Sequence, residues 1–182
     1  MSVQSPTEVA EALHGLVPGF LPFPIFTEVA RLVVTPCLEL VCFRVGPDGT
    51  IQVLLTKRGA DDPNWPNQLH SPGTVIRATD VNDDGTFSSA IGRIVRQELG
   101  DMELRTAPKL VTHLFHHVKR GVEIGFVHWV VVGSAPDHCE FYDVTALPDN
   151  LIEHHYKVIA TALSGYSAEF SEADLLPRMF DN

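Results

Sequence analysis

A carboxylate within an apolar helix face is the first sign of chemistry in this sequence. The stretch from Ser88 to Leu99 predicts a helix, and one arc of that helix carries apolar side chains: Ile91, Ile94, Val95 and Leu99. Glu98 falls inside the same arc. Burying a charge without a partner is costly, and a glutamate in the last turn also faces the negative end of the helix dipole. Helix stability alone therefore does not explain Glu98.

Two kinds of partner are open for Glu98. A metal ion could bind the carboxylate, or an arginine could form a structural ion pair with it, and the candidates are Arg58, Arg77 and Arg93. Arg58 ends a predicted strand, and Arg77 follows a short one. Guanidinium groups bind phosphate through a bidentate fork. We therefore predict Arg58 and Arg77 as substrate-binding residues.

Turn signals divide the first half of the chain into elements. The first fifteen residues predict a short helix with Thr7 as its N-cap, and the proline-rich stretch 18–24 ends it. TPCLELVCFRV and IQVLLTKR flank GPDG and predict a β-hairpin. A short strand, HSPGTVI, and a polar loop precede the helix that carries Glu98. Ser88 or Ser89 is expected to cap this helix, and Gly100 to end it in the left-handed conformation.

The second half predicts another hairpin, a strand and a long helix. LVTHLFHHV and VEIGFVHWVVV flank KRG, HCEFYDV adds a strand, and LPDNLIEHHYKVIATAL has apolar residues at helical spacing. Strands and helices alternate irregularly rather than as repeated βαβ units, which favours an α+β fold with a mixed sheet. We divide the 182 residues into an N-terminal helical extension (1–36), one domain (37–164) and a C-terminal tail (165–182).

The composition narrows the class of ligand. A net charge of -10 argues against nucleic-acid polymers and anionic membranes, because the field of the protein repels phosphate polymers. No apolar run is long enough to span a membrane and the N-terminus carries no leader, so we expect a soluble, cytoplasmic protein. A small phosphorylated ligand remains possible if local cations or a metal ion hold it.

The stretch from Gly73 to Gly100, GTVIRATDVNDDGTFSSAIGRIVRQELG, resembles the Nudix box, G-x5-E-x7-R-E-U-x-E-E-x-G-U, in which U is bulky and apolar. Arg93, Val95 and Glu98 match the arginine, the apolar position and the second glutamate of the E-E pair, and Gly100 matches the glycine. IQVLLTKRG, DPNWPNQLHSPGTVI and EFYDVTALPDNLIEHH resemble further family segments. The resemblance implies a Nudix-type α/β/α sandwich with a mixed β-sheet.

The box is degenerate where the family binds metal. Its other two helix glutamates are replaced by Ile94 and Gln97, and an insertion of about six residues separates Gly73 from the helix. The resemblance implies that Glu98 is the catalytic residue and a ligand of Mg²⁺, with Gln97 as a weak auxiliary ligand. Three loop aspartates could compensate for the lost ligands: Asp80, Asp83 and Asp84.

Three functions follow as expectations. The resemblance implies a Nudix-type hydrolase of a nucleoside diphosphate linked to another group, with weak or lost activity. The alternative is a noncatalytic nucleotide-binding or regulatory module on the same fold. A third reading is assembly, because four apolar residues of the N-terminal extension could pack against a second subunit in a homodimer, or equally against their own domain: Phe20, Phe23, Ile25 and Phe26.

Other polar residues are not selected by any pattern. On a strand, His113 and His117 share one face and His116 takes the other, which is weak evidence for zinc. His154 and His155 lie on the predicted last helix, and we expect one to be exposed and the other packed. Two further carboxylates, Glu123 and Glu140, and the aromatic residues Trp65, Phe141 and Tyr142 have no assigned role.

Overall fold

The first predicted hairpin forms the centre of the fold in the computed structural model, which describes residues 5–100, 102–133 and 136–170. Strands β1 (Thr35–Val45) and β2 (Ile51–Lys57) pair antiparallel. In the turn between them, the Gly46 N–H donates to the Thr50 carbonyl, and Gly49 has a φ of 82° that favours glycine. The GPDG turn signal is therefore confirmed.

The strands form one mixed seven-stranded sheet. Its main order is β3 (Leu69–His70), β2, β1, β6 (Gly121–Val131) and β5 (Lys109–Val118). β4 (Gly73–Val75) pairs with β1, and β7 (Cys139–Asp143) pairs with β2. β1 and β6 run parallel, whereas the other pairs are antiparallel. The second predicted hairpin, β5 and β6, is confirmed.

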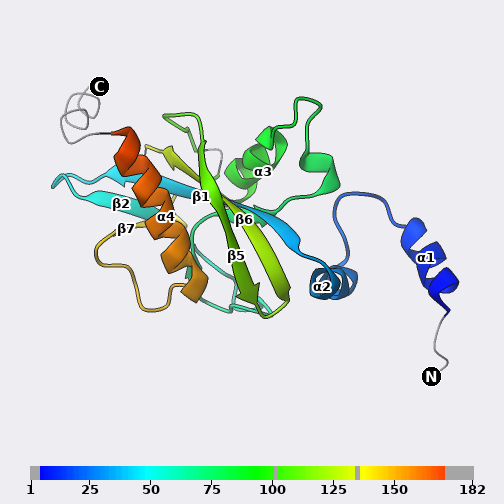
Figure 1. Cartoon of the computed structure of the whole chain (residues 1–182). Helices are drawn as coiled ribbons and strands as arrows, with labels where there is room; N and C mark the ends of the chain where they lie inside the picture. The colour runs from blue at the N-terminus through cyan, green and yellow to red at the C-terminus, as the bar shows by residue number, and fades with distance from the viewer. Residues whose placement is uncertain (1–4, 101, 134–135, 171–182) are drawn as a thin grey trace.

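Two helices cover the two faces of the sheet, as Figure 1 shows. Alternate residues of β1 point to opposite faces, so Val41 and Phe43 pack under α4 (Glu153–Glu169), and Leu38 and Leu40 under α3 (Ser88–Glu98). Each face buries its own apolar cluster. The predicted α/β/α sandwich with a mixed sheet is therefore confirmed.

The N-terminal extension holds two helices rather than one. α1 (Pro6–His14) stands apart from the sheet in Figure 1 and buries no residue. Its N-cap is Ser5, not Thr7 as predicted, because Ser5 and Glu8 form a capping box. α1 ends before the proline-rich stretch 18–24, as predicted, but Pro22 and Pro24 also begin a second helix, α2 (Phe23–Leu32), since the first turn of a helix needs no N–H from proline.

α2 packs against the start of β6. Gly121 has a φ of 143°, and a Cβ at this position would lie only 2.2 Å from the Ala30 carbonyl oxygen. A residue with a side chain would therefore collide with α2. Glycine at this turn lets the N-terminal extension approach the sheet.

The helix ends differ in part from the predictions. Phe87, not Ser88 or Ser89, is the N-cap of α3, and it makes no side-chain cap hydrogen bond. Gly100 has a φ of 57°, which confirms the left-handed terminator. α4 continues to Glu169, so the predicted tail begins as helix, and residues 171–182 of that tail lie outside the described part. Within the described ranges, we found no helix with the length and apolarity needed to cross a membrane.

Candidate functional site

A cavity of about 580 Å³ lies where β1 changes its partner strand. β2 pairs with β1 at Phe43 to Val45, whereas β4 pairs with it at Cys37 to Glu39. The end of α3, the start of α4, the segment from Pro18 to Val33, the segment from Arg58 to Ser71 and the turn between β5 and β6 contribute further walls. The cavity is therefore enclosed jointly by the domain and by its N-terminal extension.

Glu98 lies in the wall of this cavity, at the end of α3. Its carboxylate accepts a hydrogen bond of 3.4 Å from the Gly73 N–H. Burial raises the pKa of Glu98 to about 7. In the described residues Glu98 forms no ion pair with an arginine, so the expectation of a structural ion pair is wrong there.

The other two metal positions of the family pattern point away from the cavity. Ile94 is only 1% exposed and belongs to the apolar cluster under α3. Gln97 is exposed and does not line the cavity. Glu98 is therefore the one side chain of the three that faces the space where a ligand would bind.

The side chain of Arg93 is engaged in contacts within the fold and is not part of the cavity wall. It pairs with Asp80, and its guanidinium also donates to Thr74 Oγ1 and to the Val75 carbonyl. Arg93 and Asp80 are both buried. Burial alone would raise the pKa of Asp80, but the hydrogen bond from Arg93 holds this pKa below its usual value. The carboxylate of Asp80 is thus already occupied.

The remaining loop aspartates also fail to reach the cavity. Asp83 and Asp84 are exposed, and neither lines the cavity wall. Asp84 accepts hydrogen bonds from the backbone and hydroxyl of Thr86, as in an Asx turn. The geometry therefore does not bring the predicted substitutes for the lost glutamates to Glu98.

Glu39 and Glu98 both lie beside Gly73. Glu39 was not predicted from the sequence as a site residue. A Cβ on Gly73 would lie 2.8 Å from Glu39 Oε2, the atom that has no hydrogen-bond partner. Burial, followed by repulsion from Glu123 and Glu98, raises the pKa of Glu39 to about 8. The available signal was one acidic residue inside the apolar run TPCLELVCF, which is unusual in a buried strand.

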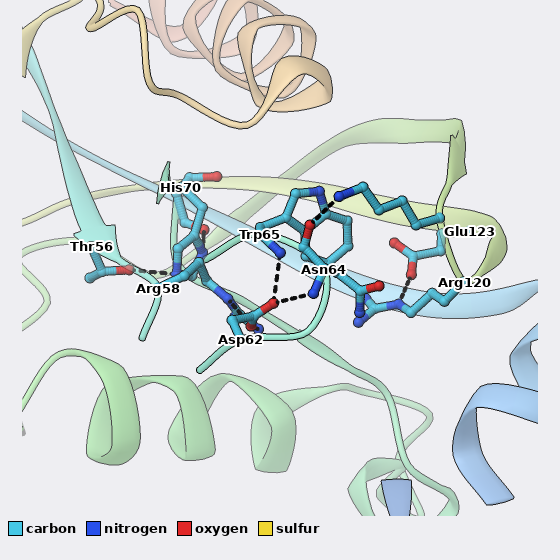
Figure 2. A network of polar contacts seen from close by, with 10 residues as sticks. Thr56, Arg58, Asp62, Asn64, Trp65, His70, Arg120 and Glu123 are labelled. Atoms are coloured by element: carbon cyan, nitrogen blue, oxygen red, sulfur yellow. Dashed lines mark hydrogen bonds and ion pairs between the residues drawn. The ribbon is translucent and has the colours of Figure 1, made fainter. Parts of the chain in front are cut away.

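Two of the cavity arginines are paired with acids, as Figure 2 shows. Arg58 Nε donates to Asp62 at 2.8 Å, and Arg120 pairs with Glu123. The Arg120 guanidinium also lies 5.2 Å from the Trp65 ring centroid and 5.5 Å from that of Phe26. Such cation–π contacts hold the guanidinium in place.

Arg77 differs from these two arginines. It lines the cavity and lies 5.2 Å from the Phe20 ring centroid, but it forms no ion pair within the described residues. Both predicted substrate-binding residues, Arg58 and Arg77, thus lie in the cavity wall. Only Arg77 is left without an acidic partner in the described part of the chain.

Neutral histidines form another part of the wall. His70 contacts Thr56 at 3.0 Å, and His155 contacts Ser71 at 2.8 Å. Burial lowers the pKa of His70 and of His154 to about 4. His155 is packed as expected for one of the pair, but His154 is half-buried rather than exposed, because its ring contacts His155 and Trp65.

The strand histidines divide as their alternation predicts. His113 and His117 are exposed, whereas His116 is buried with its ring 4.9 Å from that of His154. Within the described ranges, no three acidic, histidine or cysteine side chains are placed to hold a metal ion. Mg²⁺ favours several hard oxygen ligands in octahedral geometry. The residues present do not fit the magnesium site that the family pattern implies.

Comparison with known proteins identifies the fold. No family model and no curated protein matches the sequence. The NUDIX domain of Shewanella oneidensis NrtR, solved with ADP ribose, has a TM-score of 0.52 at 16% identity over 86% of this chain and 97% of that one. The chain has the Nudix fold.

Other Nudix structures agree with this assignment. A MutT/nudix family protein from Enterococcus faecalis has a TM-score of 0.53 at 14% identity over 94% of this chain and 73% of that one. Shewanella oneidensis NrtR has a TM-score of 0.56 at 13% identity over 74% of this chain, which spans 64% of the NrtR chain. At these identities the similarity concerns the Nudix fold alone.

Proposed function

We propose that the cavity binds a small phosphorylated ligand, a nucleotide or a nucleoside diphosphate linked to another group, and that its hydrolysis is weak or absent. One observation carries the proposal. Of the three helix positions that bear carboxylates in the Nudix pattern, Ile94 is in the core, Gln97 is on the surface, and only Glu98 faces the cavity. The fold thus keeps a ligand cavity without the acidic cluster that would hold magnesium.

The cationic wall supports a phosphorylated ligand. Arg77 has no acidic partner in the described residues, and a guanidinium forms charge-assisted hydrogen bonds with phosphate. The ADP ribose complex of the NrtR NUDIX domain gives a ligand to test on this fold. Phe20 and Trp65 line the same cavity and offer rings for stacking.

The single carboxylate that α3 presents to the cavity supports the prediction that hydrolysis is weak. A metal ion contributes several kcal/mol to hydrolysis by polarising a phosphoryl oxygen or activating water. Glu98 offers one carboxylate from the helix, and its pKa of about 7 leaves much of it protonated at neutral pH. Magnesium should therefore bind weakly, and a nucleophilic water should be poorly activated.

Binding and turnover of ADP-ribose together test the proposal. We expect calorimetry to detect binding, and turnover with magnesium to be at least about a hundredfold slower than that of an intact-box Nudix enzyme. Glu98→Gln should change this residual turnover little. Turnover comparable to the intact enzyme and abolished by Glu98→Gln would establish the hydrolase instead, and an absence of binding would remove both functions for this ligand.

A further inference from the structure

The cavity wall contains acidic and basic side chains that have no ion-pair partner in the described residues. Among its charged lining residues, Arg58 is paired with Asp62, and Arg120 with Glu123. Within the described residues, the lining side chains without an ion pair are then Glu39, Glu98 and Arg77. A phosphate can satisfy Arg77, but it cannot satisfy two carboxylates.

Glu39 is built into the wall without a partner. It is only 5% exposed, and its Oε2 atom has no hydrogen-bond partner among the residues that the structure describes. A buried acceptor without a partner destabilises the fold, and more so when it is charged. Glycines leave the space that this carboxylate occupies, because a Cβ on Gly125 would lie 3.2 Å from Glu39 Cγ, and one on Gly73 would lie 2.8 Å from Oε2.

A second acceptor lies beside the same glycine. A Cβ on Gly125 would lie 3.4 Å from His116 Nε2 and 3.6 Å from Glu39 Oε1. His116 is also 5% exposed, and its Nε2 has no hydrogen-bond partner in the described part of the chain. Burial lowers the pKa of His116, so the ring is neutral, and Nε2 accepts a hydrogen bond when Nδ1 carries the proton. Glu39 and His116, which each carry a polar atom without a partner in the described residues, thus lie beside the same glycine.

Aromatic rings extend from the same cavity. Phe20 is 72% exposed and Phe23 is 49% exposed, although both line the cavity wall. Cations are attracted to the faces of such rings. A cavity that holds both carboxylates and exposed aromatic rings suits an organic cation better than a bare metal ion, which needs additional oxygen ligands.

We propose that Glu39, together with Glu98, binds the ammonium group of an amine ligand. A primary ammonium carries three donors and can satisfy both carboxylates at once. This inference rests on the proposed function in that the same ligand would present its phosphate to Arg77. The chemical class of ligand is then a phosphorylated amine with an apolar or aromatic body.

Three related probes separate the two groups of such a ligand. O-phosphotyramine carries a ring, an ammonium group and a phosphate, 4-ethylphenyl phosphate lacks the ammonium group, and tyramine lacks the phosphate. On the wild-type protein, calorimetry should show O-phosphotyramine binding at least about tenfold more tightly than 4-ethylphenyl phosphate, because hydrogen bonds to charged groups contribute about 1.5–3 kcal/mol. Equal affinities would overturn the inference, and no variant is needed for this result.

Two variants locate the ammonium group. Glu39→Gln should remove the tenfold advantage, whereas Glu103→Gln, at an exposed glutamate outside the cavity, should keep it. Gly125→Ala should also weaken O-phosphotyramine, because its methyl group would crowd Glu39 and His116. An advantage that survives in Glu39→Gln would contradict the assignment.

The probes also distinguish this inference from the proposed function. If tyramine binds in a Glu39-dependent manner but neither phosphate binds, the ammonium site stands and the phosphate site fails. If both phosphates bind equally, the phosphate site stands and the ammonium site fails. A Glu39-dependent Mn²⁺ site that displaces tyramine would overturn the ammonium assignment in favour of a metal.

Discussion

Two sites beside β4, each formed with a residue of α3, use buried charge in opposite ways. At the first site, Arg93 and Asp80 form a buried ion pair whose remaining hydrogen bonds go to β4 and to the backbone N–H of Arg77. At the second site, Glu98 and Glu39 both lie beside Gly73, and neither forms an ion pair with a cation in the described residues. A satisfied pair holds structure, whereas unsatisfied acids inside a cavity are available to a ligand.

This difference separates the architectural part of the box from its chemical part. Arg93 and Gly100 match the Nudix pattern and shape the start and end of the segment. Ile94 and Gln97 depart from the Nudix pattern, and neither side chain lines the cavity. The Nudix fold is therefore formed here without carboxylates at positions 94 and 97.

Arg93→Met should destabilise the fold by removing the buried Arg93–Asp80 ion pair. The substitution leaves Asp80 buried without its cation, so we expect the free energy of unfolding to fall by about 3–5 kcal/mol. Urea denaturation measures this change. The matched control is Arg31→Met, whose exposed pair with Glu28 should contribute no more than about 1 kcal/mol. A similar small loss for Arg93→Met would show that the buried pair is not structural.

Glu39→Gln should show how much the ionisation of the buried Glu39 carboxylate destabilises the fold. The folded pKa of about 8 lies above the ordinary value of 4.5, so the folded protein keeps a proton that the unfolded chain loses as the pH rises. Wild-type stability should therefore fall between these two pH values and level off above them. Relative to wild type, Glu39→Gln should gain about 2–4 kcal/mol across this window, in urea titrations at several pH values. A pH-independent difference would contradict the pKa shift.

Gly121→Ala should separate the extension from the domain. Its φ of 143° is strained for alanine, and the new Cβ would collide with the Ala30 carbonyl. We expect a loss of about 1–3 kcal/mol together with faster proteolysis of α2. Gly15→Ala is the control, because a Cβ on Gly15 would lie 3.5 Å from the Ala12 carbonyl oxygen, an ordinary van der Waals contact. Unchanged proteolysis would mean that α2 does not depend on this turn.

Arg77→Gln should weaken phosphate binding with little effect on stability. Its guanidinium has no ion pair to lose in the described residues, so the cost should appear in the complex. We expect about a tenfold loss of ADP-ribose affinity by calorimetry. Lys57→Gln is the control, because Lys57 is exposed and does not line the cavity. Equal effects of the two substitutions would argue against a role for Arg77.

Local signals predicted most of the fold. The GPDG turn and the alternating strands located both hairpins, and Gly100 located the end of α3, because these features depend on neighbouring residues. α2 was missed because Pro22 and Pro24 read as helix breakers, although the first turn of a helix tolerates proline. Its position also depends on Gly121, which is distant in sequence.

The candidate site was predicted only in part. Glu98, Arg58 and Arg77 were chosen from their positions in elements, and all three line the cavity. Glu39 was not, because only strand pairing brings β1 beside Gly73. The partner of Arg93 was equally hidden, since Asp80 reaches it across a loop of the insertion. Contacts between distant segments therefore decided which acids are satisfied.

The central claim is that this Nudix cavity holds its ligand through its own side chains rather than through a metal ion. The most direct measurement is the affinity for ADP-ribose by calorimetry, once with EDTA and once with excess magnesium. We predict that the two dissociation constants agree within about twofold. Binding that disappears with EDTA and returns with magnesium would contradict the claim.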